Sequence, residues 1–228
     1  MEKRKIVIFG DSILRGVTIN EENNRYTFSK TIDWEGIEKR FDIILENYAR
    51  IGATISYGYD SIVKYLESGK RCSAAIIGYG GNDCDYNWAE VAADGNIIHP
   101  PKTAPVKFEE TLDKILDILI NYDIKPILMT LPPIFATRYY EWFMQTGLNK
   151  ENIMKHLGSI DIIYRHQEYY SNIIASVAAK RNIDIANVRE KFLLRKDMIS
   201  LIGKDGIHPN YEGEQIIIKT FLEKYSAD

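Results

Sequence analysis

Short aliphatic runs alternate with longer segments of helical character along this chain, and this alternation constrains the fold more than any other feature of the sequence. Strands that alternate with helices are typical of a parallel sheet covered by helices. The sequence therefore predicts an α/β fold with a parallel sheet of about five strands. The strand candidates are Lys5–Phe9, Asp42–Asn47, Ala74–Tyr79, Lys125–Leu131 and Asp184–Val188.

Helical periodicity is clearest in three segments. Apolar side chains recur at the spacing of an amphipathic helix in Phe108–Ile120 and again in Tyr169–Arg181. A last helix is predicted over about Tyr211–Tyr225. These helices would cover the faces of the predicted sheet.

The chain has 228 residues, enough for one substantial core and short for two, so we expect a single domain over residues 1–228. Two segments, 83–105 and 132–160, do not fit compact connections. Both carry aromatic residues and leave the carboxyl ends of predicted strands, where ligands bind in an open α/β sheet. We expect these long excursions to be functional loops or lids. The alternative is that their aromatic side chains simply cover the core.

The composition is that of a soluble globular protein, with 45% hydrophobic and 27% charged residues and a formal net charge of −3. Such a charge gives no broad attraction for nucleic acid or anionic lipid, so we expect neither as a partner. The apolar stretch Ile6–Phe9 is too short for a signal peptide or a membrane span, which predicts a cytoplasmic protein. Cys72 and Cys84 have no zinc-binding or disulfide spacing and are expected to be reduced thiols.

The first candidate for chemistry is Gly10-Asp11-Ser12, which follows the first predicted strand. Gly10 would allow a sharp turn that leaves the Ser12 hydroxyl open to attack a substrate. An Asp-Ser pair is also a common start of a helix, so the block alone favours a helix cap. Serine becomes a nucleophile only where a base removes its proton, and that requires a histidine oriented by a third group.

Asp205 and His208 supply that base. A carboxylate three residues before a histidine, in a loop constrained by Gly206 and Pro209, can hold the imidazole in one tautomer while its other nitrogen faces the serine.

Two further blocks lie at predicted strand ends. Gly52 follows the second strand and can bring a backbone N–H close to a ligand, although it could equally belong to a plain turn. Asn82 follows Gly80-Gly81 after the third strand and offers a side-chain N–H, with a turn-forming role as the alternative.

Taken together and in this order, the four blocks resemble the motifs of the SGNH/GDSL hydrolase superfamily. The resemblance spans Gly10 to His208 and includes Leu131-Pro132-Pro133 after the fourth predicted strand. It implies a three-layer α/β/α sandwich with a flavodoxin-like sheet. One departure lies beside the serine, where Ile13 takes the place of the usual leucine and Leu14 follows. That change bears on substrate contacts rather than on the nucleophile.

The resemblance also implies a residue-by-residue mechanism. Ser12 would be the nucleophile, His208 the general base and then acid, and Asp205 the orienting carboxylate. The backbone N–H groups of Ser12 and Gly52 and the side chain of Asn82 would form the oxyanion hole. The protein would then be a serine esterase that cleaves a short acyl or acetyl ester of a small molecule, sugars included, without cofactor or metal.

Other readings stay open at this point. Asp11, Asp83, Asp205 and His208 are hard-cation ligands that could serve a metal-dependent phosphoesterase, although a two-metal site would be short of ligands. The fold could also be a binding module without turnover. Asp11 is expected to cap a helix and Asp83 to tie down its loop. Surface or structural roles are expected for the remaining arginines and histidines near the motifs: Arg15, Arg50, Arg138, Arg165, His99, His156 and His166.

Overall fold

The computed structural model describes residues 3–20, 22–29 and 33–226 and is built around a five-stranded parallel sheet. The strand order is β4-β1-β5-β6-β7, in which the first strand of the sheet lies between the second and the third. This is the flavodoxin-like order, so the predicted fold class is confirmed. Each strand overlaps its predicted run: β1 Arg4–Gly10, β4 Ile43–Asn47, β5 Ala74–Gly78, β6 Lys125–Met129 and β7 Asp184–Ala186.

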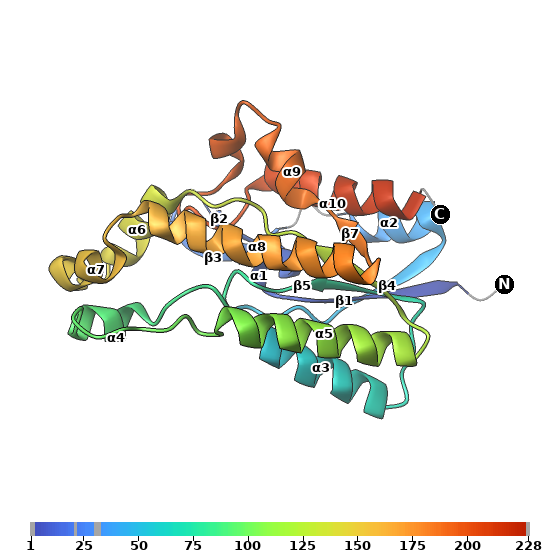
Figure 1. The fold of residues 1–228 in the computed structure, drawn as a ribbon. Helices are drawn as coiled ribbons and strands as arrows, with labels where there is room; N and C mark the ends of the chain where they lie inside the picture. The colour runs from blue at the N-terminus through green and yellow to red at the C-terminus, as the bar shows by residue number, and fades with distance from the viewer. Residues whose placement is uncertain (1–2, 21, 30–32, 227–228) are drawn as a thin grey trace.

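Helices cover both faces of this sheet and give three layers (Figure 1). Successive side chains of a strand point to opposite faces: Val7 and Phe9 join one apolar cluster, while Ile6 and Ile8 join the other. The first cluster is completed by α3 (Ile55–Glu67), α5 (Pro105–Asn121) and α8 (Asp161–Arg181). The second is completed by α2 (Trp34–Phe41), α9 (Val188–Leu193) and α10 (Tyr211–Ser226).

Three predicted helices are present with longer or shifted bounds. The segment Phe108–Ile120 is the central part of α5, which begins at Pro105 because a proline is well tolerated at the first helical position. Tyr169–Arg181 is the second half of α8, and Tyr211–Tyr225 corresponds to α10.

The segments 83–105 and 132–160, which we expected to be functional loops or lids, contain helices. They hold α4 (Trp88–Ala93), α6 (Ala136–Met144) and α7 (Lys150–Leu157), which lie beyond the carboxyl ends of the strands (Figure 1). We call these three helices the cap. Their apolar side chains bury one another in a third cluster, within which the rings of Trp88 and Phe143 stack at 4.4 Å. That burial is the physical reason why these segments fold into helices.

A small hairpin was not predicted. It consists of β2 (Val17–Asn20) and β3 (Arg25–Phe28), paired antiparallel, and it follows the single-turn helix α1 (Ser12–Arg15). All four residues of β3 are exposed, so this strand buries no apolar face, and at four residues its pattern is short for a strand prediction. A short 3₁₀ helix, Met198–Leu201, precedes the loop that carries His208.

Candidate active site

Ser12 is the first residue of α1 and stands immediately beyond the end of β1. The preceding Asp11 caps the helix, because its Oδ1 accepts a hydrogen bond from the backbone N–H of Ile13 at 2.9 Å. The cap role therefore belongs to Asp11 and not to Ser12, which is itself buried. A Cβ atom on Gly10 would lie 2.7 Å from the Leu14 side chain, so only glycine lets the strand turn this closely into the helix.

His208 reaches Ser12 from the opposite end of the chain. The Nε2 atom of His208 lies 2.8 Å from the Ser12 Oγ, and its Nδ1 lies 2.5 Å from Oδ2 of Asp205. Asp205 is fully buried. The three side chains form a continuous hydrogen-bonded line from carboxylate to imidazole to hydroxyl.

The loop that holds this pair is fixed by backbone contacts. Oδ1 of Asp205 accepts the backbone N–H groups of Ile207 at 3.0 Å and His208 at 3.1 Å. Gly206 has a φ of +75°, and a Cβ there would lie 2.5 Å from the Phe135 carbonyl oxygen. The sequence Asp205-Gly206-Ile207-His208 thus supplies the acid, the turn and the base in one tight loop.

Asn82 lines the cavity beside the serine, whereas Gly52 is only the chain neighbour of Ala53, which Asn82 contacts. The Nδ2 of Asn82 donates to the Ala53 carbonyl oxygen at 3.1 Å and lies 3.4 Å from Oδ2 of Asp11. Gly52, the residue before Ala53, has a left-handed φ of +73° and is exposed. Asn82 lines the same cavity as Ser12 and His208, whereas Gly52 is linked to it through Ala53.

Two buried carboxyl groups support these positions. Burial raises the pKa of Asp11 to about 6, against the opposing effect of the Ile13 N–H. Burial also raises the pKa of Asp83 to about 6, although its two oxygens accept the Ile55 N–H at 3.0 and 3.1 Å. Asp83 therefore ties its loop to the start of α3, as expected from the sequence.

A cavity of about 120 Å³ opens beside the serine. Ser12, Asn82 and His208 line it, and its other walls come from the end of β6, from the segments that follow β5 and β6, from the cap and from α8. These walls are largely apolar and include Met129, Leu131, Ile134, Trp88, Tyr139 and Ile163.

Asp85 joins the cap to the cavity and was not identified from the sequence. Its Oδ1 accepts hydrogen bonds from Trp88 Nε1 and from the Tyr139 hydroxyl, both at 2.9 Å. Its Oδ2 forms an ion pair with Lys102 at 2.9 Å. One carboxylate thus orients two aromatic walls of the cavity. The sequence does not indicate this role, because Tyr139 lies 54 positions away in a separate segment.

Tyr26 is a second residue that the sequence did not indicate. It belongs to β3, and its ring lies 5.2 Å from the His208 imidazole in an edge-on arrangement. The same ring contacts Trp142 of α6 at 6.1 Å. The hairpin therefore covers the outer side of the His208 imidazole.

The remaining candidates have mostly structural contacts. Arg138 donates to the carbonyl oxygens of Ile199 and Ile202, and Arg50 stacks over the Tyr57 ring. His166 differs from the expectation, because it lines the cavity while its Nδ1 lies 2.9 Å from the Cys84 carbonyl oxygen. Cys84 also lines the cavity, but burial raises the pKa of its thiol well above the ordinary value, which disfavours a thiolate.

Within residues 3–20, 22–29 and 33–226, no group of three or more histidine, cysteine, aspartate or glutamate side chains is placed to hold a metal ion. No helix there combines the length and the apolar character needed to cross a bilayer.

Comparison with known proteins places this chain in a family. The model of the GDSL-like lipase/acylhydrolase family matches residues 6–221. The chain belongs to this family. Because the family consists of lipases and acylhydrolases, the protein is a carboxylic ester hydrolase. A search of curated proteins gave no match.

Several solved structures share the fold at low sequence identity. The lipase/acylhydrolase from Enterococcus faecalis aligns with a TM-score of 0.70 and 16% identity, covering 98% of this chain and 96% of that one. Axe2, an acetylxylan esterase from Geobacillus stearothermophilus, aligns with a TM-score of 0.67 and 17% identity over 97% and 93%. TesA aligns with a TM-score of 0.61 and 16% identity over 98% and 99%.

Proposed function

We propose that this GDSL-like hydrolase is a serine esterase that works through an acyl-enzyme on Ser12. The observation that carries the proposal is the hydrogen-bonded line from Asp205 through His208 to the Ser12 Oγ, with separations of 2.5 and 2.8 Å. The serine and the histidine are 196 positions apart in the sequence. A nucleophile, a base and an orienting acid in this order match the requirements for attack on an ester carbonyl.

The proposed reaction has two halves. In the first, His208 Nε2 takes the proton from Ser12 Oγ as the oxygen attacks the ester carbonyl carbon, and it then passes that proton to the departing alcohol. In the second, His208 removes a proton from water, whose oxygen attacks the acyl-enzyme, and returns that proton to Ser12 as the acid leaves. Asp205 holds the Nδ1–H and stabilises the imidazolium formed in each half.

The negative charge on the carbonyl oxygen needs donors in each transition state. We assign these to the backbone N–H groups of Ser12 and Gly52 and to Nδ2 of Asn82. The 3.4 Å contact between Asn82 Nδ2 and Asp11 Oδ2 is long for a hydrogen bond, so this N–H is the weaker held of the two on Nδ2 and is the one that we assign to the oxyanion. Each such donor contributes roughly 3 kcal/mol to the stabilisation of the transition state.

The substrate that we propose is a short acyl or acetyl ester of a small molecule, sugars included. A cavity of about 120 Å³ with apolar walls beside Ser12 suits a small acyl group better than a long chain. Aromatic side chains such as Trp88 and Tyr139 can pack against either an acyl group or a sugar ring. We propose the cytoplasm as the compartment in which the protein meets this ester.

The test is hydrolysis of p-nitrophenyl acetate by the wild type and by Ser12→Ala. We expect the variant to lose at least ~10³-fold in kcat, because the residual oxyanion hole alone cannot replace the nucleophile. Circular dichroism and the melting temperature should stay unchanged, which separates lost chemistry from lost structure. Full activity in the folded variant would contradict the proposal.

A further inference from the structure

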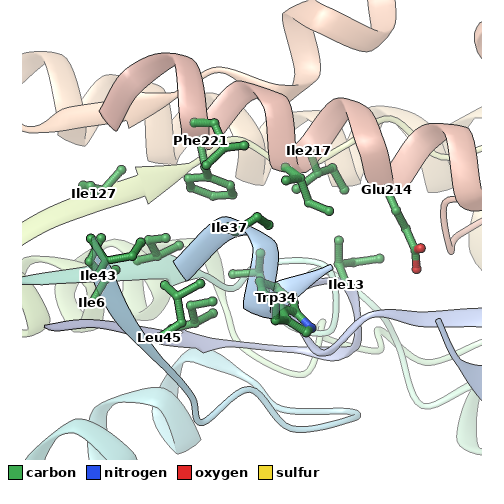
Figure 2. A pocket seen from close by; sticks show the side chains of 15 residues that line it. Ile6, Ile13, Trp34, Ile37, Ile43, Leu45, Ile127, Glu214, Ile217 and Phe221 are labelled. Carbon is green, nitrogen blue, oxygen red and sulfur yellow. The ribbon is translucent and has the colours of Figure 1, made fainter. Parts of the chain in front are cut away.

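A second cavity lies on the other side of Ile13 from the catalytic one. It has a volume of about 80 Å³ and lies between the sheet, α2 and α10. Figure 2 shows Ile13 and Glu214 at one end and Ile6, Ile43 and Ile127 at the other. Among the described residues that line this cavity, Glu214 alone is charged, and the others carry apolar or indole side chains. The cavity is therefore suited to an alkyl chain that runs along the strands.

The helix α2 closes one side of this cavity and is lightly held. None of its residues is buried, and its Trp34 side chain, which lines the cavity, is 36% exposed. A helix with so little buried surface can yield to a ligand at low cost.

Ile13 is the residue that the linings of the two cavities have in common. Its backbone is pinned on both sides, because its N–H donates to Asp11 Oδ1 at 2.9 Å and its carbonyl oxygen accepts the Gly16 N–H at 3.1 Å. Only its side chain can change the separation between the cavities. In a helix, the β-branched isoleucine is largely restricted to one χ1 rotamer, which makes it a stiff partition.

We propose that Ile13 sets the limit on acyl-chain length by closing the catalytic cavity against this apolar one. The inference rests on the proposed acyl-enzyme, because the acyl chain on Ser12 would begin one residue away from Ile13. With Ile13 in place, a chain that outgrows the catalytic cavity meets the isoleucine side chain. With that side chain shortened, the tail of a longer chain enters the apolar cavity.

The test compares kcat/KM on p-nitrophenyl acetate, butyrate and octanoate. We expect the wild type to favour the shorter esters. In Ile13→Ala the octanoate-to-acetate ratio should rise about tenfold or more, since each methylene buried from water strengthens binding. Ile13→Val, which shortens the partition less, should raise the ratio by about threefold.

Filling the apolar cavity should reverse the gain. Ile37→Phe on α2 and Ile217→Phe on α10 each place extra carbon into that cavity. Either change combined with Ile13→Ala should return the ratio to the wild-type value, and either change alone should leave acetate hydrolysis unaltered. The matched control is Ile207→Ala, which enlarges the catalytic cavity only and should shift the ratio by less than about threefold.

Several outcomes would overturn the inference. The ratio could stay unchanged in folded Ile13→Ala, the gain could persist after the cavity is filled, or the wild type could already prefer octanoate. If Ile13→Ala fails to fold, the octanoate-to-acetate ratio is measured in Ile13→Val with and without Ile37→Phe. A ratio that rises in Ile13→Val and falls back with Ile37→Phe supports the inference, and an unchanged ratio overturns it. An inactive Ser12→Ala beside an unchanged ratio would refute the partition alone, whereas an active Ser12→Ala would refute the proposed function.

Discussion

The two halves of the candidate site are built in different ways. The half that would carry the chemistry is Ser12, at the start of α1 just beyond β1, with Asp205 and His208 on one glycine-containing loop. Asp205 and His208 are near neighbours in sequence, and one hydrogen bond joins His208 to Ser12. The half that would hold the substrate comes from the cap, where Asp85 orients Trp88 and Tyr139. Changes in the first half should act on kcat, and changes in the second on KM and substrate choice.

The largest effect that separates the halves is expected for Asp205→Asn. An amide cannot hold the His208 Nδ1–H in the same way, so the imidazole would present the wrong tautomer to Ser12. We expect kcat to fall about 10⁴-fold with KM nearly constant. Steady-state kinetics on p-nitrophenyl acetate measures both quantities, and a KM effect larger than the kcat effect would break the division.

Asn82→Ala should give the next largest effect. The variant removes one proposed oxyanion donor, so kcat should fall by about 10²–10³. Asn87→Ala is a matched control, because Asn87 stands before α4 with its side chain on exposed Glu90. Equal losses in the two variants would argue against a role for Asn82 in the transition state.

Asp11→Asn tests the electrostatics beneath the catalytic half. Burial raises the pKa of Asp11 from its ordinary 3.8 to about 6, so the folded state favours the protonated carboxyl. The associated stability is fully present below pH ~4 and is lost as the pH rises through ~6. The variant imitates the neutral form, so its unfolding free energy should exceed that of the wild type at pH 7 by an amount on the order of 3 kcal/mol. The difference should vanish near pH 4.

Urea unfolding of both proteins at several pH values between ~4 and ~7 measures this difference. A constant difference across that range would mean that Asp11 does not titrate with a raised pKa.

The smallest effect is expected in the cap. Asp85→Asn leaves Lys102 without its ion pair and weakens the hold on Trp88 and Tyr139. We expect KM to rise by about threefold to tenfold while kcat changes less than about threefold. The control is Asp94→Asn, which should behave like the wild type. The Asp94 carboxylate lies at the end of α4 and accepts the backbone N–H of Asn96. A kcat loss in Asp85→Asn comparable to that of Asn82→Ala would erase the distinction between the halves.

The same two halves differ in how far the sequence predicts them. Short local patterns in the sequence contain the strands and five site candidates: Ser12, Gly52, Asn82, Asp205 and His208. These patterns suffice to predict a common site, because a parallel sheet brings the ends of its strands to one edge. Asp205 and His208 also fall within one loop, so their contact requires no distant partner.

The cap and the hairpin depend on contacts between segments far apart in the chain. The Trp88 ring stacks on Phe143, the Tyr139 hydroxyl donates a hydrogen bond to Asp85, and the Tyr26 ring contacts the His208 imidazole. Each of these side chains looks like an ordinary loop residue until its partner is placed beside it. The sequence therefore predicted the framework and the catalytic candidates, while it did not indicate the helices within the two excursions, nor Asp85 and Tyr26.

The central claim is that Ser12 is activated by His208, and covalent labelling tests it most directly. The wild-type protein, Ser12→Ala and His208→Ala would be treated with a fluorophosphonate, and the intact masses and the modified peptide would be measured. If His208 activates Ser12, we expect one adduct on Ser12 in the wild type, none in folded Ser12→Ala and strongly slowed labelling in His208→Ala. Labelling that persists in Ser12→Ala, or that proceeds at the wild-type rate without His208, would contradict it.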